Sequence, residues 1–173
     1  MPRAKRHFLP GYAWHITHRC HKGEFLLKFE RDRRDWVGWL FEAKKRYRLH
    51  VLDYTVTSSH IHLLVLDKGK RDTIPRAMQL IAGRTAQEFN RRKGRKGAFW
   101  GDRYYATAVE TNQHLIACLT YIDLNMVRAE AVAHPSEWPA GGYIELQQPR
   151  KRYSIIDRRA LRELLRMPSD GEF

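Results

Sequence analysis

Four stretches of the chain carry the apolar patterns of β-strands. Residues 12–20 and 103–110 alternate between apolar and polar side chains, as strands with one covered face do. Residues 49–57 are rich in β-branched and aromatic side chains, and residues 60–66 are mostly apolar. Because only the turn-forming pair Ser58-Ser59 separates these two stretches, we predict that they form a hairpin.

Apolar side chains recur at helical spacing between and after these strands. The predicted helices cover residues 32–48, 72–92, 112–129 and 155–165. Asp32, Asp72 and Thr111 stand where a helix N-cap is expected. The predicted order is therefore β-α-β-β-α-β, which is that of a ferredoxin-like split βαβ unit. We predict an α+β domain, an RRM-like antiparallel sheet backed by two helices, with an additional helix after it.

The net charge of the chain indicates the class of molecule that it binds. The chain has 32 Lys and Arg residues against 19 Asp and Glu, a formal net charge of +13. An excess of this size favours a polyanionic partner, most often a nucleic acid. Basic side chains beside aromatic ones are typical of grooves for single strands, although such charge runs are also found in solvated loops. The basic residues predicted to contact nucleic acid are Arg91, Arg92, Lys93, Arg95, Lys96 and Arg103.

The sequence also excludes several classes of protein. Its apolar runs are shorter than the roughly 20 residues that a membrane span needs. The basic stretch 1–12 lacks the apolar core of a secretory signal. The only cysteines, Cys20 and Cys118, form neither a zinc knuckle nor a disulfide scaffold. We therefore expect a protein of the reducing cytosol with no membrane attachment.

Two histidines stand at the start of the strand predicted over residues 60–66. Because alternate residues of a strand share a face, His60 and His62 point the same way and Ile61 points the other way. Two imidazoles on one face can bind one metal ion, including Mg²⁺ in a mixed N/O site. Two hydrogen-bonded histidines at a sheet edge fit the same spacing. A catalytic metal needs about three protein ligands, so a third must come from elsewhere.

The helix predicted over residues 112–129 offers further candidates. Tyr121, Asn125 and Arg128 lie at i, i+4 and i+7, in one row along the flank of its apolar stripe. An amide oxygen can bind a hard cation, an activated phenol can be a nucleophile, and arginine binds phosphate. Together with two histidines, these groups match phosphoryl transfer. Each alone is also compatible with an ordinary helix, where Arg128 would offset the helix dipole.

Several blocks resemble one family. HIHLLV, FNRRKGRKGAFWGDRYYATAVE and YIDLNMVRA resemble, in this order, the blocks of REP-associated tyrosine transposases, from about Gly11 to Tyr143. These are bacterial relatives of single-tyrosine insertion-sequence transposases, in the HUH class of single-strand nucleases. The resemblance implies that His60, His62 and Asn125 bind Mg²⁺ or Mn²⁺ and that Tyr121 is the nucleophile.

The activity implied by the resemblance is that of a metal-dependent endonuclease and strand-transferase. Such an enzyme cuts single-stranded DNA, often beside a hairpin, through a 5′-phosphotyrosine intermediate. We expect residues 1–148 to form the catalytic domain and residues 149–173 a basic tail that contacts DNA through a short helix. Arg128 is a further expected DNA contact. A monomer is favoured, a dimer stays open, and the expected location is the bacterial cytoplasm, at the nucleoid.

The chain departs from the family pattern at three places. Residues 57–59 read Thr-Ser-Ser where Met-Pro-Asn is usual, Met126 replaces a proline after Asn125, and residues 139–143 replace a Trp-Ser-Ser-Tyr-like segment. Loss of the proline predicts a longer or straighter tyrosine helix. These changes leave a weakened or domesticated enzyme as one alternative. Two others are a non-catalytic nucleic-acid-binding module and a metal phosphoesterase that activates water instead of tyrosine.

Overall fold

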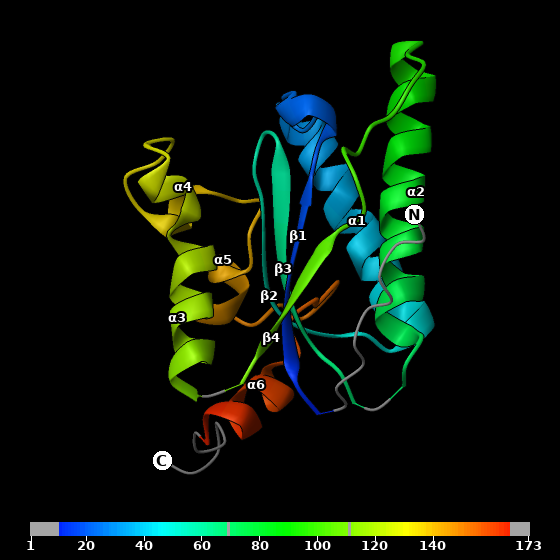
Figure 1. Ribbon diagram of the computed structural model, residues 1–173. Coiled ribbons are helices and arrows are strands. Elements are labelled where there is room, and N and C mark those ends of the chain that lie inside the picture. Colours follow the sequence, from blue (N-terminus) through cyan, green and yellow to red (C-terminus); the bar gives the residue numbers. More distant parts are fainter. Residues whose placement is uncertain (1–10, 69, 111, 167–173) are drawn as a thin grey trace.

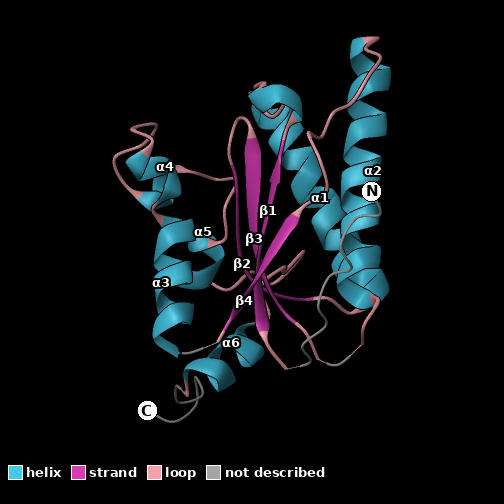
Figure 2. Ribbon diagram, viewed as in Figure 1, coloured by secondary structure: helices cyan, strands magenta, loops and turns pink. Residues whose placement is uncertain are grey.

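The computed structural model describes residues 11–68, 70–110 and 112–166 of the chain. A four-stranded antiparallel sheet in the order β2-β3-β1-β4 forms its centre (Figures 1 and 2). The strands are β1 (Ala13–Arg19), β2 (His50–Val56), β3 (His60–Leu66) and β4 (Tyr105–Val109). The helices are α1 (Glu30–Tyr47), α2 (Thr73–Lys93), α3 (Asn112–Asp123), α4 (Asn125–Arg128), α5 (Tyr143–Gln147) and α6 (Arg158–Leu165), with 3-10 turns η1 (His21–Gly23) and η2 (Pro135–Glu137). None of the helices in these ranges has the length and apolarity to cross a membrane.

The predicted α+β fold is confirmed. Helices α1 and α2 cover one face of the sheet, and α3 lies on the other (Figure 1). The α1–α2 side holds the larger core, in which Ile16 and Leu63 of the sheet meet Trp36 and Ile81 of the helices, all fully buried. Burying apolar side chains of this size stabilises the fold by about 1.5–3 kcal/mol each. This face is therefore structural.

The opposite face of the sheet, on which α3 lies, is apolar at one end and polar at the other. A smaller core at one end joins Leu64 of β3 to Leu115 and Ile122 of α3 and Leu161 of α6. Toward the start of β3 the apolar residues give way to polar ones, because His62 pairs in register with Thr17 and Thr55. Cross-strand partners project from the same face. The polar end of this face is where the candidate site lies.

The predicted start of α1 and the predicted capping bond of α2 need correction. Helix α1 begins at Glu30 rather than at Asp32, so Asp32 lies inside its first turn. The Asp32 carboxylate is buried and paired with the Arg92 guanidinium of α2 instead of capping its own helix. Asp72 does occupy the N-cap position of α2, but its side chain pairs with Arg76 at 3.1 Å and makes no cap hydrogen bond. Thr111 lies outside the described residues.

The prediction of one continuous helix over residues 112–129 was wrong. Helix α3 ends at Asp123, Leu124 interrupts it, and α4 begins at Asn125. The break follows directly on a carboxyl pair, the half-buried Asp123 with the buried Asp53 of β2. Burial raises the pKa of both groups, and the Asp123 charge further raises that of Asp53. This pair of carboxyls lies where the end of α3 meets the sheet.

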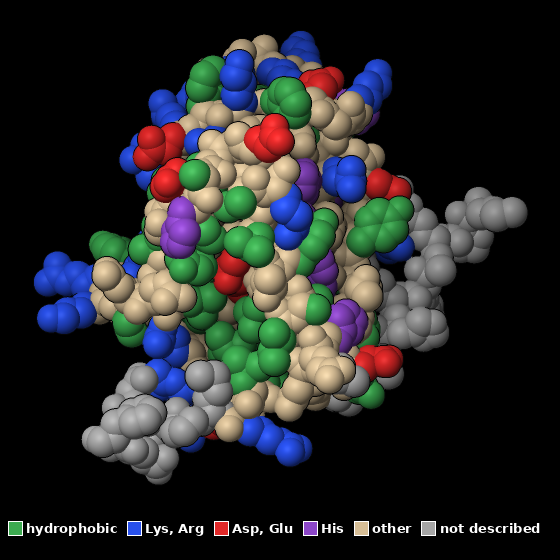
Figure 3. Space-filling model, turned by 90° about the vertical axis from the view of Figure 1, so that its left-hand side faces the viewer, with side chains coloured by type: hydrophobic (Ala, Val, Ile, Leu, Met, Phe, Trp, Pro, Cys, Tyr) green, Lys and Arg blue, Asp and Glu red, His purple; other side chains and the backbone are tan. Residues whose placement is uncertain are grey.

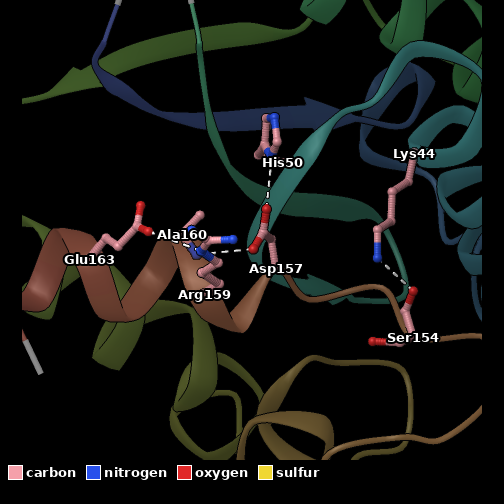
Figure 4. Close-up of polar contacts among 7 residues, drawn as sticks. All are labelled: Lys44, His50, Ser154, Asp157, Arg159, Ala160 and Glu163. Carbon is pink, nitrogen blue, oxygen red and sulfur yellow. Dashed lines mark hydrogen bonds and ion pairs between the residues drawn. The ribbon is translucent and has the colours of Figure 1, made fainter. Parts of the chain in front are cut away.

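The C-terminal segment, predicted to begin at residue 149, packs on the same sheet. Ile155 and Ile156 belong to the main core, and Ile156 forms a parallel bridge with Val51. Lys44 Nζ donates a 2.7 Å hydrogen bond to the Ser154 carbonyl. Figure 4 shows this contact together with those at the start of α6, where Asp157 contacts His50. DNA contact by this segment stays a prediction.

Candidate active site

The two histidines of the strand form the centre of the site. His60 and His62 project from the face of the sheet that carries α3, with their ring centroids 5.0 Å apart. His62 is buried, whereas His60, at the start of β3, is partly exposed. The alternation of a strand brings the two side chains together, as the sequence predicted.

The chain places Tyr121 against this pair. The Tyr121 ring lies 5.5 Å from that of His62, centroid to centroid, and is edge-on to it. The Tyr121 side chain is 46 % exposed, so its hydroxyl is accessible to a large substrate. One helical turn later, Asn125 Nδ2 lies 3.3 Å from His62 Nε2. The amide oxygen and nitrogen of Asn125 are interchangeable by rotation, so either can face the imidazole.

Arg128 lies against Tyr121 rather than projecting away from it. Its guanidinium carbon is 4.2 Å from the centroid of the Tyr121 ring, and its Nη2 donates a 2.6 Å hydrogen bond to the Tyr121 carbonyl. A guanidinium over an aromatic face is a cation–π contact. The bond to a carbonyl near the end of α3 also satisfies an acceptor that the helix leaves open. Arg128 thus restrains the ring and the backbone of Tyr121 together.

Sequence reasoning missed a third imidazole. His15 of β1 lies with its Nε2 3.0 Å from His62 Nδ1, and its ring centroid is 6.1 Å from that of Tyr121. The alternation of the first strand could have placed His15 and Thr17 on one face. His15 meets the histidines of β3 only because β1 pairs with β3 in a particular register, and these two strands are distant in the sequence. The sequence alone contains no signal for that register.

The imidazoles are held in the neutral form. Burial, together with the nearby His60 and His15 charges, lowers the pKa of His62 to about 3. Burial also lowers the pKa of His60, with a further contribution from Arg19, and that of His15, with one from His114. Neutral imidazoles have a lone pair to offer, which a metal ligand requires.

The candidate donors for a metal ion are two imidazoles and one amide. Within the described ranges, no group of three or more His, Cys, Asp or Glu side chains is placed to hold an ion. Imidazole nitrogen with amide oxygen suits a mixed N/O site for Mn²⁺ or Mg²⁺. His60, His62 and Asn125 fit that chemistry and lie beside one exposed phenol.

The basic residues predicted to contact nucleic acid divide into two groups. Helix α2 extends through Lys93, so the first half of the basic block is helical rather than part of a loop. Arg92 pairs with buried Asp32, and Arg95 pairs with Glu24 at 3.7 Å, which gives both a structural role. The second group consists of predicted contacts whose side chains are exposed, which are Arg91, Lys93, Lys96 and Arg103. Figure 3, which views the α3 side, shows Lys and Arg mainly around the margin of that face.

Comparison with known proteins identifies the family. Residues 11–125, which contain the histidine pair, the tyrosine and Asn125, match the family described as "Transposase IS200 like". The chain belongs to this family. The resemblance seen in the sequence is thereby confirmed. No curated protein matches the chain.

Two solved structures are similar to the fold of this IS200-like transposase family member. A REP-associated tyrosine transposase bound to a REP hairpin superimposes with a TM-score of 0.69 at 18 % identity, covering 91 % of this chain and 94 % of that one. A candidate transposase from Deinococcus radiodurans R1 gives a TM-score of 0.48 at 14 % identity, covering 67 % and 92 %. At this identity the first match shows a common fold, and the second carries no argument.

Proposed function

We propose that this IS200-like transposase is a metal-dependent single-strand DNA endonuclease and strand-transferase with Tyr121 as its nucleophile. The observation that carries the proposal is the contact within one chain between the exposed Tyr121 and the buried His62 of the histidine pair, at 5.5 Å between ring centroids. A nucleophilic tyrosine needs to be accessible to DNA and close to the group that polarises the phosphate. Because one chain supplies all these groups, a monomer suffices for cleavage.

The metal requirement follows from the donor set. His60 and His62 would hold the ion with their ring nitrogens, and Asn125 with its amide oxygen. When bound, Mg²⁺ or Mn²⁺ supplies Lewis-acid polarisation and orientation of the scissile phosphate. Burial keeps the imidazoles neutral, so they do not have to lose a proton before they bind a cation.

Each step of the proposed reaction forms one phosphoester bond and breaks another. The phenolic oxygen of Tyr121 attacks phosphorus and loses its proton, and the bond from phosphorus to the 3′ oxygen breaks. The 3′ oxygen leaves and is protonated, while the 5′ phosphate stays on the tyrosine. Attack on this phosphotyrosine by a 3′ hydroxyl reverses the exchange and rejoins strands without ATP. Arg128 keeps the ring in place for both directions.

The proposed substrate is single-stranded DNA beside a hairpin. The structural relative with a TM-score of 0.69 was solved with a REP hairpin. The net charge of +13 fits a polyanion. The proposed contacts to the DNA backbone are the exposed basic residues of the block FNRRKGRKGAFWGDRYYATAVE, which are Arg91, Lys93, Lys96 and Arg103.

The test is formation of a covalent protein–DNA adduct. The full chain is incubated with Mn²⁺ and 5′- or 3′-labelled oligonucleotides that contain a hairpin, and the products are separated on denaturing gels. We expect an adduct only with the fragment 3′ of the cut, because that fragment carries the 5′ phosphate. Tyr121→Phe should abolish the adduct.

Tyr12→Phe provides the matched control, because Tyr12 is another exposed tyrosine and lies just before β1, at the opposite end of that strand from Thr17, the partner of His62 in register. It should leave the adduct unchanged. Cleavage that persists in Tyr121→Phe would instead show a phosphoesterase that activates water. Binding without cleavage, insensitive to a chelator, would show a non-catalytic binding module.

A further inference from the structure

The two histidines of the site make their supporting contacts through the same ring nitrogen. His60 Nδ1 lies 3.1 Å from each of two hydroxyls, Thr57 Oγ1 and Ser59 Oγ. His62 Nδ1 lies 3.0 Å from Nε2 of His15. Nε2 of His62 faces Asn125. Each ring therefore turns Nδ1 toward a supporting residue and has Nε2 left for a metal ion.

The hydroxyls of Thr57 and Ser59 orient the His60 ring. The Thr57 hydroxyl accepts from the backbone N–H groups of Ser59 and His60, at 3.2 Å and 3.1 Å, and lies 3.1 Å from His60 Nδ1. The Ser59 hydroxyl lies 3.1 Å from the same nitrogen. The Thr-Ser-Ser segment thus provides hydroxyls that hold Nδ1 of His60 and leave Nε2 for a cation.

Nδ1 of His62 has one such partner, Nε2 of His15 at 3.0 Å. We infer that His15 is a positioning residue that accepts the Nδ1–H of His62 through its own Nε2, so that His62 presents an unprotonated Nε2 to the metal ion. This inference rests on the proposed function. Asn125 contacts the other ring nitrogen, Nε2, at 3.3 Å, so His15 and Asn125 lie at the two opposite nitrogens of His62.

The position of His15 suits this role. Strand β1 pairs with both β3 and β4, so His15 lies in the interior of the sheet rather than on an edge or a loop. Ligand histidines are commonly oriented by a hydrogen bond at their second nitrogen, and loss of that partner weakens metal binding about 10–100-fold. His15 would do this without contacting the metal or the DNA.

The test measures the tautomer of His62 and the affinity for Mn²⁺ separately. In the metal-free, ¹⁵N-labelled full chain, two-bond N–H correlation spectra should show His62 mainly as the Nδ1–H tautomer. Calorimetric titration with Mn²⁺ should show about 10–100-fold weaker binding in His15→Ala. His15→Gln, whose amide oxygen can accept from Nδ1–H, should recover most of the affinity. Melting curves of the variants confirm that they are folded.

His134→Ala is the control, because His134 is an exposed imidazole next to η2 and contacts Ser136 rather than the site. It should bind Mn²⁺ as the wild type does. Equal affinity in His15→Ala, or His62 found as the Nε2–H tautomer, overturns the inference and leaves the proposed function standing. A changed pH profile of adduct formation with unchanged Mn²⁺ affinity also overturns it, since His15 would then act as a base. A wild type that binds no Mn²⁺ overturns both.

Discussion

At the scale of single residues, Arg128 is the side chain whose role the contacts define most closely. It was predicted as a DNA contact, but it lies over the Tyr121 ring at 4.2 Å and donates to the Tyr121 carbonyl. A cation–π contact at an exposed site contributes about 0.5–1 kcal/mol. If this energy holds the ring in its attacking position, Arg128→Ala should slow adduct formation roughly two- to fivefold.

Measurement of single-turnover rates with saturating DNA isolates this effect from DNA affinity. Arg128→Lys is the informative companion, because it keeps the charge but loses the planar guanidinium that lies over the ring. We expect Arg128→Lys to be as slow as Arg128→Ala while binding DNA like the wild type. A Lys variant with the full rate would show that Arg128 acts through its charge, as a DNA contact.

The residues also show what the sequence could predict. His60, His62, Tyr121 and Asn125 were found because the spacing within one strand or one helix determines which side chains are neighbours. His15 was missed because its proximity to His62 depends on the pairing of β1 with β3, which brings together residues 47 positions apart. Local periodicity contains no information about such pairing.

At the scale of elements, the start of α6 connects the C-terminal segment to the sheet. Asp157 accepts from the Ala160 N–H at 3.0 Å, as an N-cap, and lies 2.7 Å from His50 Nδ1 of β2 (Figure 4). Burial tends to raise the pKa of Asp157, but its hydrogen bonds with Ala160 and His50 outweigh this and lower it. A carboxyl with a lowered pKa in the folded state stabilises the fold above its unfolded pKa of about 3.9 and loses that contribution as the pH falls.

Asp157→Ala and Asp157→Asn separate the cap from the charge. Loss of the cap in the Ala variant should lower the free energy of unfolding by about 0.5–2 kcal/mol at pH 7. The Asn variant keeps a capping oxygen, so its main change should be a shallower loss of stability between about pH 5 and pH 2. Urea unfolding at several pH values measures both. Parallel acid profiles in the wild type and the Asn variant would contradict this role of Asp157.

Most strands and helices lie close to their predicted ranges, with small corrections at helix starts and a larger one at the break after α3. Strands and helices were predictable because each has a long apolar face with a clear period. The break between α3 and α4 was not, because Leu124 continues the helical pattern and no proline or glycine marks the position. The helix ends beside Asp53, a residue of β2 that no window around Leu124 contains. A tertiary contact thus overrides a local preference.

At the scale of the whole molecule, the net charge of +13 does not show which of the basic residues contact DNA. The sequence groups Arg92 with Lys96, yet the fold uses them differently. Arg92 is paired with Asp32, whose side chain is 2 % exposed, so it holds α2 to α1. Lys96, beyond the end of α2, is exposed. Charge composition therefore predicts the class of partner better than it predicts the contact residues.

This division can be tested with two substitutions that remove the same charge. Arg92→Ala leaves a carboxylate buried without its partner, so it should lower the free energy of unfolding by about 2–3 kcal/mol, measured by urea unfolding. Lys96→Ala should leave stability within about 0.5 kcal/mol.

In DNA titrations, however, Lys96→Ala should reduce the slope of log affinity against log salt concentration by about 0.7, the value for one phosphate contact on a single strand. Because Arg92 is engaged with Asp32, its removal should change that slope less, provided the protein is kept folded at low temperature. The opposite pattern, a large salt effect for Arg92 and none for Lys96, would place the DNA along α2 instead of beyond its end.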